Sequence, residues 1–247
     1  MRSRLHRMVA ARFRRKPAYR ASVRPMVSFT FDDFPRSAWT VAGTMLGEHG
    51  AHGTYYTARG LMGKSTSVGE MFGPADLEAV VRDGHEVACH TFDHALCSKL
   101  DTGDLLGNCR KNRLSIAEDL HGYGLTNFSF PEGVVTLRAK VALSSVYVTC
   151  RTIEPGINAE PADFGFLRAN RVYSRSGIDR VKEQIRQNAE RKGWLILYTH
   201  DVTAQPSPYG CTPREFEEVL QCAVRSQAEI LSIAEATKRY QTGEAGR

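Results

Sequence analysis

The sequence lacks any apolar run that approaches the roughly 20 residues needed to cross a bilayer. It also lacks acidic residues at its start, where residues 1–24 contain eight arginines and one lysine but no Asp or Glu. Since the whole chain carries a net charge of only +6, the remainder must be slightly acidic. The high isoelectric point, about 9.1, therefore comes from this basic N-terminal tail.

The same tail lacks the continuous apolar core of a secretory signal. Leu5, Met8, Val9 and Phe13 have loose helical spacing, which indicates a short basic amphipathic helix. Such a helix either contacts an anionic membrane surface, or is a solvated tail or a terminal helix packed on the body. We therefore expect a cytoplasmic protein, with the inner face of the membrane as the location that a membrane-binding tail would suit.

The cysteines form no C-x-x-C pair. Without a secretion signal, we expect them to be reduced thiols buried as small hydrophobic residues. Two of them, Cys89 and Cys97, flank a pair of histidines, so a redox or metal-binding role stays open for these two. The six cysteines are Cys89, Cys97, Cys109, Cys150, Cys211 and Cys222.

The rest of the chain alternates between strand-like and helix-like segments. Helical patterns occupy residues 37–50, 73–84, 177–193 and 212–224. The strand candidates are short β-branched or aromatic runs, as in buried parallel strands. They are Val27–Asp33, Gly53–Ala58, Glu86–His90, Asn127–Pro131, Val146–Arg151, Phe166–Val172, Leu195–His200 and Glu229–Ser232.

This alternation predicts an α/β fold with a parallel sheet. No repeat, low-complexity block or linker divides the body of the chain. We expect a single domain, a distorted (β/α) barrel of about seven to eight parallel strands over residues 25–240. The basic tail of residues 1–24 precedes it, and a C-terminal tail of residues 241–247 follows.

Polar residues stand at the ends of four predicted strands, where barrel enzymes carry their chemistry. These strand ends are Asp32-Asp33, His90 with His94, Pro131-Glu132-Gly133, and His200-Asp201. The sequence therefore predicts that carboxylates and imidazoles meet at one mouth of the barrel.

Two imidazoles four residues apart, joined by a carboxylate, suit a metal site with open positions. His90 and His94 could share one face of a helical turn. One carboxylate of the Asp32-Asp33 pair could bind the metal, while the other stays free as a general base. In the alternative reading, Asp33 merely caps the next helix. His200 could protonate a leaving amine, or be a hydrogen-bonded histidine at the barrel rim.

Three motifs together resemble the NodB-homology polysaccharide deacetylases, carbohydrate esterase family 4, over roughly residues 25–235. They are TFDD at 30–33, HTFDH at 90–94 and ILYTHD at 196–201. The resemblance implies a distorted (β/α) barrel that removes an acetyl group from an N-acetylated sugar with Zn²⁺ or another divalent transition metal. The roles that it implies are Asp32 as base, Asp33, His90 and His94 as metal ligands, and His200 as acid.

Further site residues follow from the same resemblance. Leu197 is expected to line the acetate pocket, and the backbone N–H of Glu132, within Pro131-Glu132-Gly133, to stabilise the oxyanion. The family commonly has Gly where this chain has Phe34, which we expect to reshape the mouth. The arginine that usually holds the base is replaced by Ser129.

Two arginines could supply the missing cation, and we favour Arg168 over Arg151. The acidic motif that tunes the catalytic histidine in the family is absent, and Asp163 is the candidate to replace it. In both cases the replacement must come from another part of the chain.

The substrate implied by the resemblance is an N-acetylated glycan: a polysaccharide, an oligosaccharide, or a lipid-linked precursor of a bacterial surface polysaccharide. We expect no nucleic-acid partner, because the body carries no motif for one. Two alternatives stay open. The chain could be a barrel amidohydrolase that acts on a non-sugar amide or cyclic ureide, or a catalytically impaired glycan-binding homologue.

Overall fold

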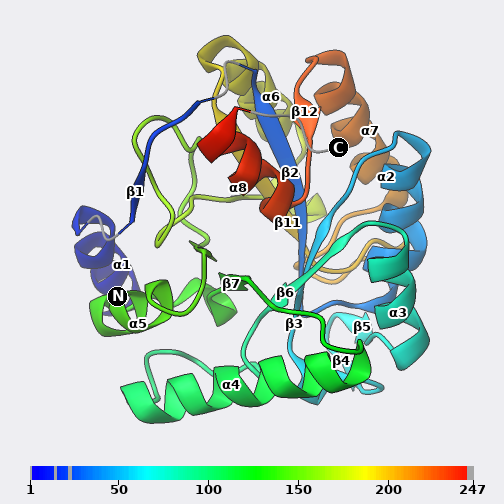
Figure 1. Ribbon diagram of the computed structural model, residues 1–247. Coiled ribbons are helices and arrows are strands. Elements are labelled where there is room, and N and C mark those ends of the chain that lie inside the picture. The colour runs from blue at the N-terminus through cyan, green and yellow to red at the C-terminus, as the bar shows by residue number, and fades with distance from the viewer. Residues whose placement is uncertain (1, 14–15, 22–23, 244–247) are drawn as a thin grey trace.

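Seven parallel strands form a curved sheet at the centre of the protein (Figure 1). This arrangement is seen in a computed structural model that describes residues 2–13, 16–21 and 24–243. The strand order is β10-β11-β2-β3-β6-β7-β8, and β12 pairs with β2. The bounds are β2 Met26–Asp32, β3 Thr54–Thr57, β6 Glu86–Cys89, β7 Asn127–Ser129, β8 Thr149–Arg151, β10 Asn170–Arg171, β11 Trp194–Thr199 and β12 Glu229–Ile230.

The two ends of the sheet approach each other. A parallel bridge between Arg151 of β8 and Leu167, just ahead of β10, connects them. The result is a distorted and incompletely closed (β/α) barrel, which confirms the predicted fold class. Each of the eight strand candidates corresponds to one of these strands.

The central strands are buried along their whole length. All residues of β2 and β11 are buried, because helices and the barrel interior cover both faces of a parallel sheet. Register pairs Thr30 with Tyr198 and Phe31 with Thr199. The residues that follow, Asp32 and His200, are thereby brought to the same edge of the sheet.

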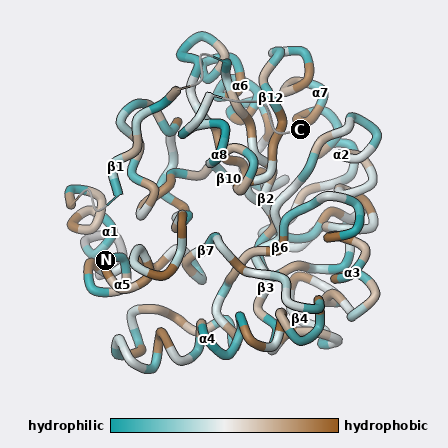
Figure 2. The backbone as a smooth tube through the Cα atoms, in the orientation of Figure 1, coloured by the Kyte–Doolittle hydropathy of each residue, from teal (hydrophilic) through white to brown (hydrophobic). Residues whose placement is uncertain are grey.

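Helices surround the strands (Figure 1). Three predicted helices are found as α3 Pro74–Arg82, α6 Asp179–Arg191 and α7 Pro213–Arg225. The fourth segment starts as a π-helix, Ala38–Gly43, and continues as α2 Thr44–Glu48. Three further helices were not predicted: α4 Thr102–Asp119, α5 Leu137–Ser144 and α8 Ile233–Thr242. Hydrophobic stretches gather where helices face the strands, and hydrophilic ones on the outer turns (Figure 2).

Helix α8 covers the N-terminal end of the barrel. The backbone N–H of Ile233 donates to Thr54 Oγ1, and that of Ala234 donates to Glu86 Oε2, each at 2.8 Å. Thr54 and Glu86 are the first residues of β3 and β6. Because this end is closed, the C-terminal ends of the strands are left as the open mouth.

The described part of the basic segment packs on the barrel. Helix α1, Arg2–Arg12, lies against α5, and Ala10 is fully buried there. Lys140 of α5 donates to the carbonyls of Ala10 and Phe13 at 2.7 and 2.6 Å and pairs with Asp163 at 2.6 Å. Strand β1, Pro17–Ala18, then pairs antiparallel with β9, Ala162–Asp163.

The remaining small elements lie in the connections. A hairpin of β4, Ser65–Thr66, and β5, Gly69–Glu70, interrupts the loop between β3 and α3. Among the described residues, no helix combines the length and the apolar character that a membrane span requires. All six cysteines are free thiols. Residues 244–247 of the expected C-terminal tail lie outside the described part of the chain.

Candidate active site

A cavity of about 490 Å³ opens at the C-terminal ends of the strands. It is lined by polar residues from β2, β11 and the loops after β6 and β7. Most predicted site residues meet here: Asp32, Asp33, His90, His94, Glu132 and His200 all line it. We refer to it as the catalytic cavity.

Asp33, His90 and His94 bring three potential ligand atoms together. Asp33 Oδ1 lies 3.6 Å from His90 Nε2 and 3.2 Å from His94 Nε2, and one ligand atom from each residue lies within 4.8 Å of the others. Asp33 Oδ1 is buried and has no hydrogen-bond partner. A buried carboxylate oxygen in this state is stabilised by a cation.

The ring of His90 is oriented by the backbone of β7. Its Nδ1 lies 2.8 Å from the carbonyl oxygen of Ser129. Because a carbonyl only accepts, Nδ1 carries a hydrogen and Nε2 presents its lone pair towards Asp33 and His94. This is the arrangement by which proteins orient metal-binding histidines. The donor set therefore fits a divalent transition metal such as Zn²⁺.

The loop that carries the two histidines is irregular rather than helical. Thr91 and His94 have left-handed backbone conformations, with φ of 62° and 53°. Asn108 of α4 supports the loop, since its Oδ1 accepts from the N–H of Phe92 at 2.6 Å. The two imidazoles converge through this turn, and not through a shared helical face as the spacing suggested.

A second left-handed turn follows β2. Asp33 and Phe34 both have positive φ, 64° and 63°, which L-residues adopt only where the surroundings compensate for the strain. The turn directs Asp33 into the cavity and Phe34 into the core. Phe34 is fully buried and stacks on Phe72, with ring centroids 4.7 Å apart. The expectation that Phe34 shapes the mouth and contacts substrate is therefore wrong.

Asp32 is held by Arg151, not by Arg168. The Arg151 guanidinium is fully buried and donates to Asp32 Oδ1 and to Ser129 Oγ. Arg168 instead donates to the carbonyl of Pro155 at 3.0 Å, at an exposed site. The preference for Arg168 is therefore corrected.

Strand register explains the replacement. Ser129 and Arg151 are direct neighbours on β7 and β8. The positive charge that β7 lacks at Ser129 is therefore supplied from the next strand, and the small serine leaves room for it. The Arg151 guanidinium also stacks between the rings of Tyr56 and Tyr198, at 4.8 and 5.0 Å.

The electrostatics of this pair favour an ionised Asp32 carboxylate. Burial opposes the charge of Asp32, but Arg151 and the nearby His90 and His200 together hold its pKa below the usual value. Burial likewise disfavours the charge of Arg151, yet Asp32 raises its pKa. Burial lowers the pKa of His90 to about 4, so this imidazole is neutral and its Nε2 can bind a cation.

His200 lies on the other side of Asp33, with its Nε2 4.0 Å from Asp33 Oδ2. Its Nδ1 is 3.3 Å from the carbonyl of Tyr209, which fixes a hydrogen on that nitrogen. Asp163, the candidate for tuning this histidine, pairs with Lys140 instead, so that expectation is wrong. Asp201 is buried and accepts from the backbone N–H and hydroxyl of Ser207.

Two expected substrate contacts are displaced by one residue. Leu197 is buried in the core outside the cavity, and its neighbour Tyr198 lines the cavity instead. Adjacent strand residues face opposite sides of the sheet. Because Tyr198 faces the cavity, Leu197 on β11 faces away from it. Pro131 is also buried and holds the turn that presents Glu132, whose φ is 52°.

Several cavity residues were not identified from the sequence, among them Arg171, Tyr173, Arg175 and Tyr209. Tyr173 and Tyr209 surround His200, with ring centroids at 6.1 and 5.6 Å. Arg171 and Tyr173 lie in or after β10, and Tyr209 in the loop after β11. Their position at or after the end of a predicted strand is the feature of the sequence that could have identified these three residues.

Comparison with known proteins gives consistent matches in fold. The structure is similar to a family 4 acetyl xylan esterase from Clostridium thermocellum in complex with a cobalt ion, at TM-score 0.57 and 18% identity, covering 86% of this chain and 90% of that one. It is also similar to PdaA, a family 4 carbohydrate esterase from Bacillus subtilis, at TM-score 0.59 and 11% identity, covering 92% and 86%. A family 4 pseudoenzyme matches at TM-score 0.60 and 12% identity, covering 90% and 70%.

At these identities the structural matches establish the fold alone. No curated protein matches the sequence. The sequence profile of the polysaccharide deacetylases, however, matches residues 20–149, more than half of the chain and including Asp32, Asp33, His90 and His94. The chain therefore belongs to the polysaccharide deacetylase family, the NodB-homology family that its motifs resemble.

Proposed function

We propose that this protein is a metal-dependent hydrolase that removes an N-acetyl group from an N-acetylated sugar. Family membership supports carbohydrate deacetylation in general. The observation that carries the more specific proposal is the convergence of Asp33, His90 and His94 beside a separate, arginine-paired Asp32. One cavity thus offers a set of metal ligands, a base and an acid.

Asp33, His90 and His94 would hold the metal, which would supply Lewis acidity to the acetamide carbonyl and to a water molecule. Asp32, kept ionised by Arg151, accepts a proton from the attacking water as its oxygen bonds to the carbonyl carbon. The backbone N–H of Glu132 would donate to the resulting oxyanion.

His200 completes the reaction on the leaving side. Its Nδ1 hydrogen is committed to the carbonyl of Tyr209, so a protonated ring can give up the proton on Nε2, the nitrogen nearer Asp33. That proton passes to the departing amine as the carbon–nitrogen bond breaks. The products are acetate and the free amino sugar, so atoms and charges balance.

The deciding experiment measures acetate release from N-acetylglucosamine oligomers by the metal-loaded and the chelator-treated protein. We expect release that disappears on chelation and returns with added Zn²⁺ or Co²⁺. Release of product only from a non-sugar amide or cyclic ureide would favour the amidohydrolase. Tight glycan binding without turnover, with the metal bound, would identify a catalytically impaired homologue.

We also propose that the protein acts at the cytoplasmic face of an anionic membrane. Helix α1 is basic, and Met8 and Val9 within it and Phe13 directly after it are about half exposed, at 51%, 49% and 56%. The six free thiols suit a reducing compartment. Co-sedimentation with vesicles that contain phosphatidylglycerol tests this. Removal of residues 2–13 should abolish binding, and binding that persists would disprove the proposal.

A further inference from the structure

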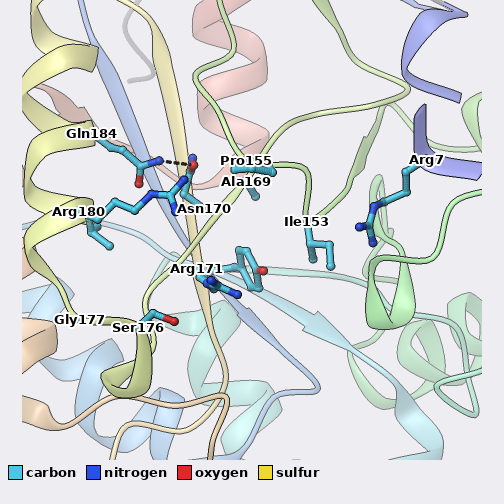
Figure 3. Close-up of a pocket in the computed structure, with 12 residues that line it drawn as sticks. Arg7, Ile153, Pro155, Ala169, Asn170, Arg171, Ser176, Gly177, Arg180 and Gln184 are labelled. Atoms are coloured by element: carbon cyan, nitrogen blue, oxygen red, sulfur yellow. Dashed lines mark hydrogen bonds between the residues drawn. The ribbon is translucent and has the colours of Figure 1, made fainter. Parts of the chain in front are cut away.

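A second cavity of about 260 Å³ adjoins the catalytic cavity (Figure 3). The two share Ile153, Arg171 and Tyr198 as common wall residues. The two cavities are therefore adjacent, and a ligand with its reacting group beside Asp33 would pass Tyr198 to reach the second one. We call it the arginine cavity because three of the residues that line it are Arg7, Arg171 and Arg180.

All charged side chains that line the arginine cavity are positive. None of the residues that line it is an Asp or Glu. Within the described part of the chain, the side chains of Arg171 and Arg180 make no hydrogen bond and no ion pair. Arg7 forms an ion pair with Glu154, which is not a lining residue; Glu154 Oε2 lies 3.8 Å from Arg7 Nε, beyond hydrogen-bond distance.

Arg7 Nε is also buried without a hydrogen-bond partner. A buried guanidinium nitrogen in this state costs free energy until an acceptor reaches it. In Figure 3, Arg7 and Arg180 lie on opposite sides of the cavity, and the guanidinium of Arg180 extends towards Asn170. A ligand in the space between them would meet guanidinium donors from both sides.

The cavity wall is rigid on the Arg180 side. Asn170 Oδ1 accepts from Gln184 Nε2 at 2.7 Å and from the backbone N–H of Gly156 at 2.9 Å. Asn170 Nδ2 donates to the carbonyl of Gly156 at 2.8 Å. These bonds tie β10, α6 and the loop after β8 together, so the space does not depend on a loose loop.

From this geometry we propose that the arginine cavity binds a phosphate group carried by the N-acetylated substrate, and this rests on the proposed deacetylase function. Arginine pairs with phosphate oxygens through parallel N–H donors. Arg171 and Arg180, which have no carboxylate partner among the described residues, together with Arg7, match a group with two negative charges better than a single carboxylate. The substrate class is therefore an N-acetylamino sugar with an attached phosphate or diphosphate.

The test compares kcat/KM for N-acetylglucosamine 1-phosphate, UDP-N-acetylglucosamine, N-acetylmuramic acid and neutral N-acetylglucosamine oligomers. We expect at least one phosphorylated sugar to exceed the neutral one by about tenfold or more, as one charge-assisted contact provides. Arg180→Gln and Arg7→Gln should each lower the phosphorylated-to-neutral ratio by about tenfold. A carboxylated sugar that gains as much as the phosphorylated ones would overturn the assignment to phosphate.

Arg186→Gln is the matched control, because Arg186 lies on the same helix α6 but faces outwards and pairs with Glu183 at 2.6 Å. It should leave the ratio unchanged. If Arg180→Gln and Arg7→Gln also leave it unchanged, the arginine cavity does not bind phosphate.

Calorimetric titration of the metal-loaded protein with N-acetylglucosamine 1-phosphate separates this proposal from the deacetylase itself. Arg180-dependent binding without acetate release would overturn the deacetylase and leave the phosphate site standing. Acetate release at equal rates from phosphorylated and neutral sugars, with no binding that depends on Arg180, would support the deacetylase and overturn the phosphate site.

Discussion

A single cross-strand contact accounts for the main departure of this chain from the family pattern. The family resemblance implies an arginine at the position that Ser129 occupies here, where it would hold the carboxylate of Asp32. In this protein the guanidinium comes from Arg151 on the neighbouring strand and reaches both residues. The charge is conserved in space although its position in the sequence has changed.

Replacing Arg151 with methionine should reduce the free energy of unfolding by about 3–5 kcal/mol, because it leaves the carboxylate of Asp32 buried without its cation. Urea denaturation measures the loss. The double variant Asp32→Asn with Arg151→Met should recover part of it. If the two losses are simply additive, the residues are not energetically coupled.

Replacing Asp32 with asparagine should lower kcat by about 10²–10⁴-fold, the usual contribution of a general base. The metal affinity should stay close to that of the parent, since Asp33, His90 and His94 are retained. Titration with Zn²⁺ alongside the deacetylation assay checks both expectations. Substantial turnover by Asp32→Asn would show that another group accepts the proton.

The sequence predicted which polar residues would meet, but not the direction of every side chain. Asp32, Asp33, His90, His94 and His200 follow strands, so position alone places them at one mouth. Phe34 was misassigned because its direction depends on two left-handed residues that no pattern in the sequence reveals.

Leu197 is a different case, because the alternation along β11 was available and favours Tyr198. The choice between Arg151 and Arg168 depended on strand register. Register depends on three-dimensional pairing and cannot be read from spacing.

At the scale of elements, the strands were predictable and some helices were not. Strand β2 and helix α7 have strong local signals, a β-branched run and a capping box between Thr212 and Glu215. Helix α4 has mixed composition along 18 residues, and only Leu105, Cys109, Asn112 and Ile116 are buried. Its formation depends on packing against the barrel, and in particular on contacts between its asparagines and the loops after β3 and β6.

A hydrogen bond between the residue ahead of β3 and the connection from α3 to β6 should make the free energy of unfolding sensitive to acid. His85 Nδ1 accepts from the backbone N–H of Gly53 at 2.9 Å. Burial, assisted by the nearby His52, lowers the pKa of His85 to about 4, while Asp83 and Glu235 act in the opposite direction. Its stabilisation is therefore present above pH 6.5 and lost as pH falls from there towards 4.

At pH 5 this loss should amount to about 2 kcal/mol in the free energy of unfolding. The variant His85→Gln keeps a side-chain acceptor but does not titrate, so its stability should fall less between pH 7 and 5. Chemical denaturation at several pH values measures both slopes. Identical slopes for the two proteins would contradict the assignment to His85.

The docking of α1 depends on one buried lysine. Lys140→Met removes the donor to the carbonyls of Ala10 and Phe13 and leaves Asp163 without this cation. We expect trypsin to cleave within residues 2–12 at least tenfold faster in this variant, since opening becomes more frequent. Lys238→Met, on the exposed side of α8, should resemble the parent, and equal cleavage rates in all three proteins would show that Lys140 does not hold α1.

At the scale of the whole molecule, metal binding should stabilise the fold, because the ligands come from segments far apart in the sequence. At a free metal concentration of 100 times Kd, the gain is about 2.7 kcal/mol, or roughly 5–10 °C in Tm for a chain of this size. Scanning calorimetry with Zn²⁺ and with chelator measures it.

The increment should vanish in His94→Ala and persist in His49→Ala, because His49 is exposed at the end of α2 and is not one of the three grouped ligands. A metal-induced shift that survives His94→Ala would place the ion elsewhere.

Arg7 gives the N-terminal helix a practical importance. It lines the arginine cavity, whose other lining residues lie between positions 153 and 198, and it reaches there only because α1 is docked on α5. An affinity tag or fusion partner joined ahead of α1 would therefore stand within two helical turns of this cavity. Substrate screens should use protein tagged at the C-terminus, because an N-terminal tag would alter the selectivity being measured.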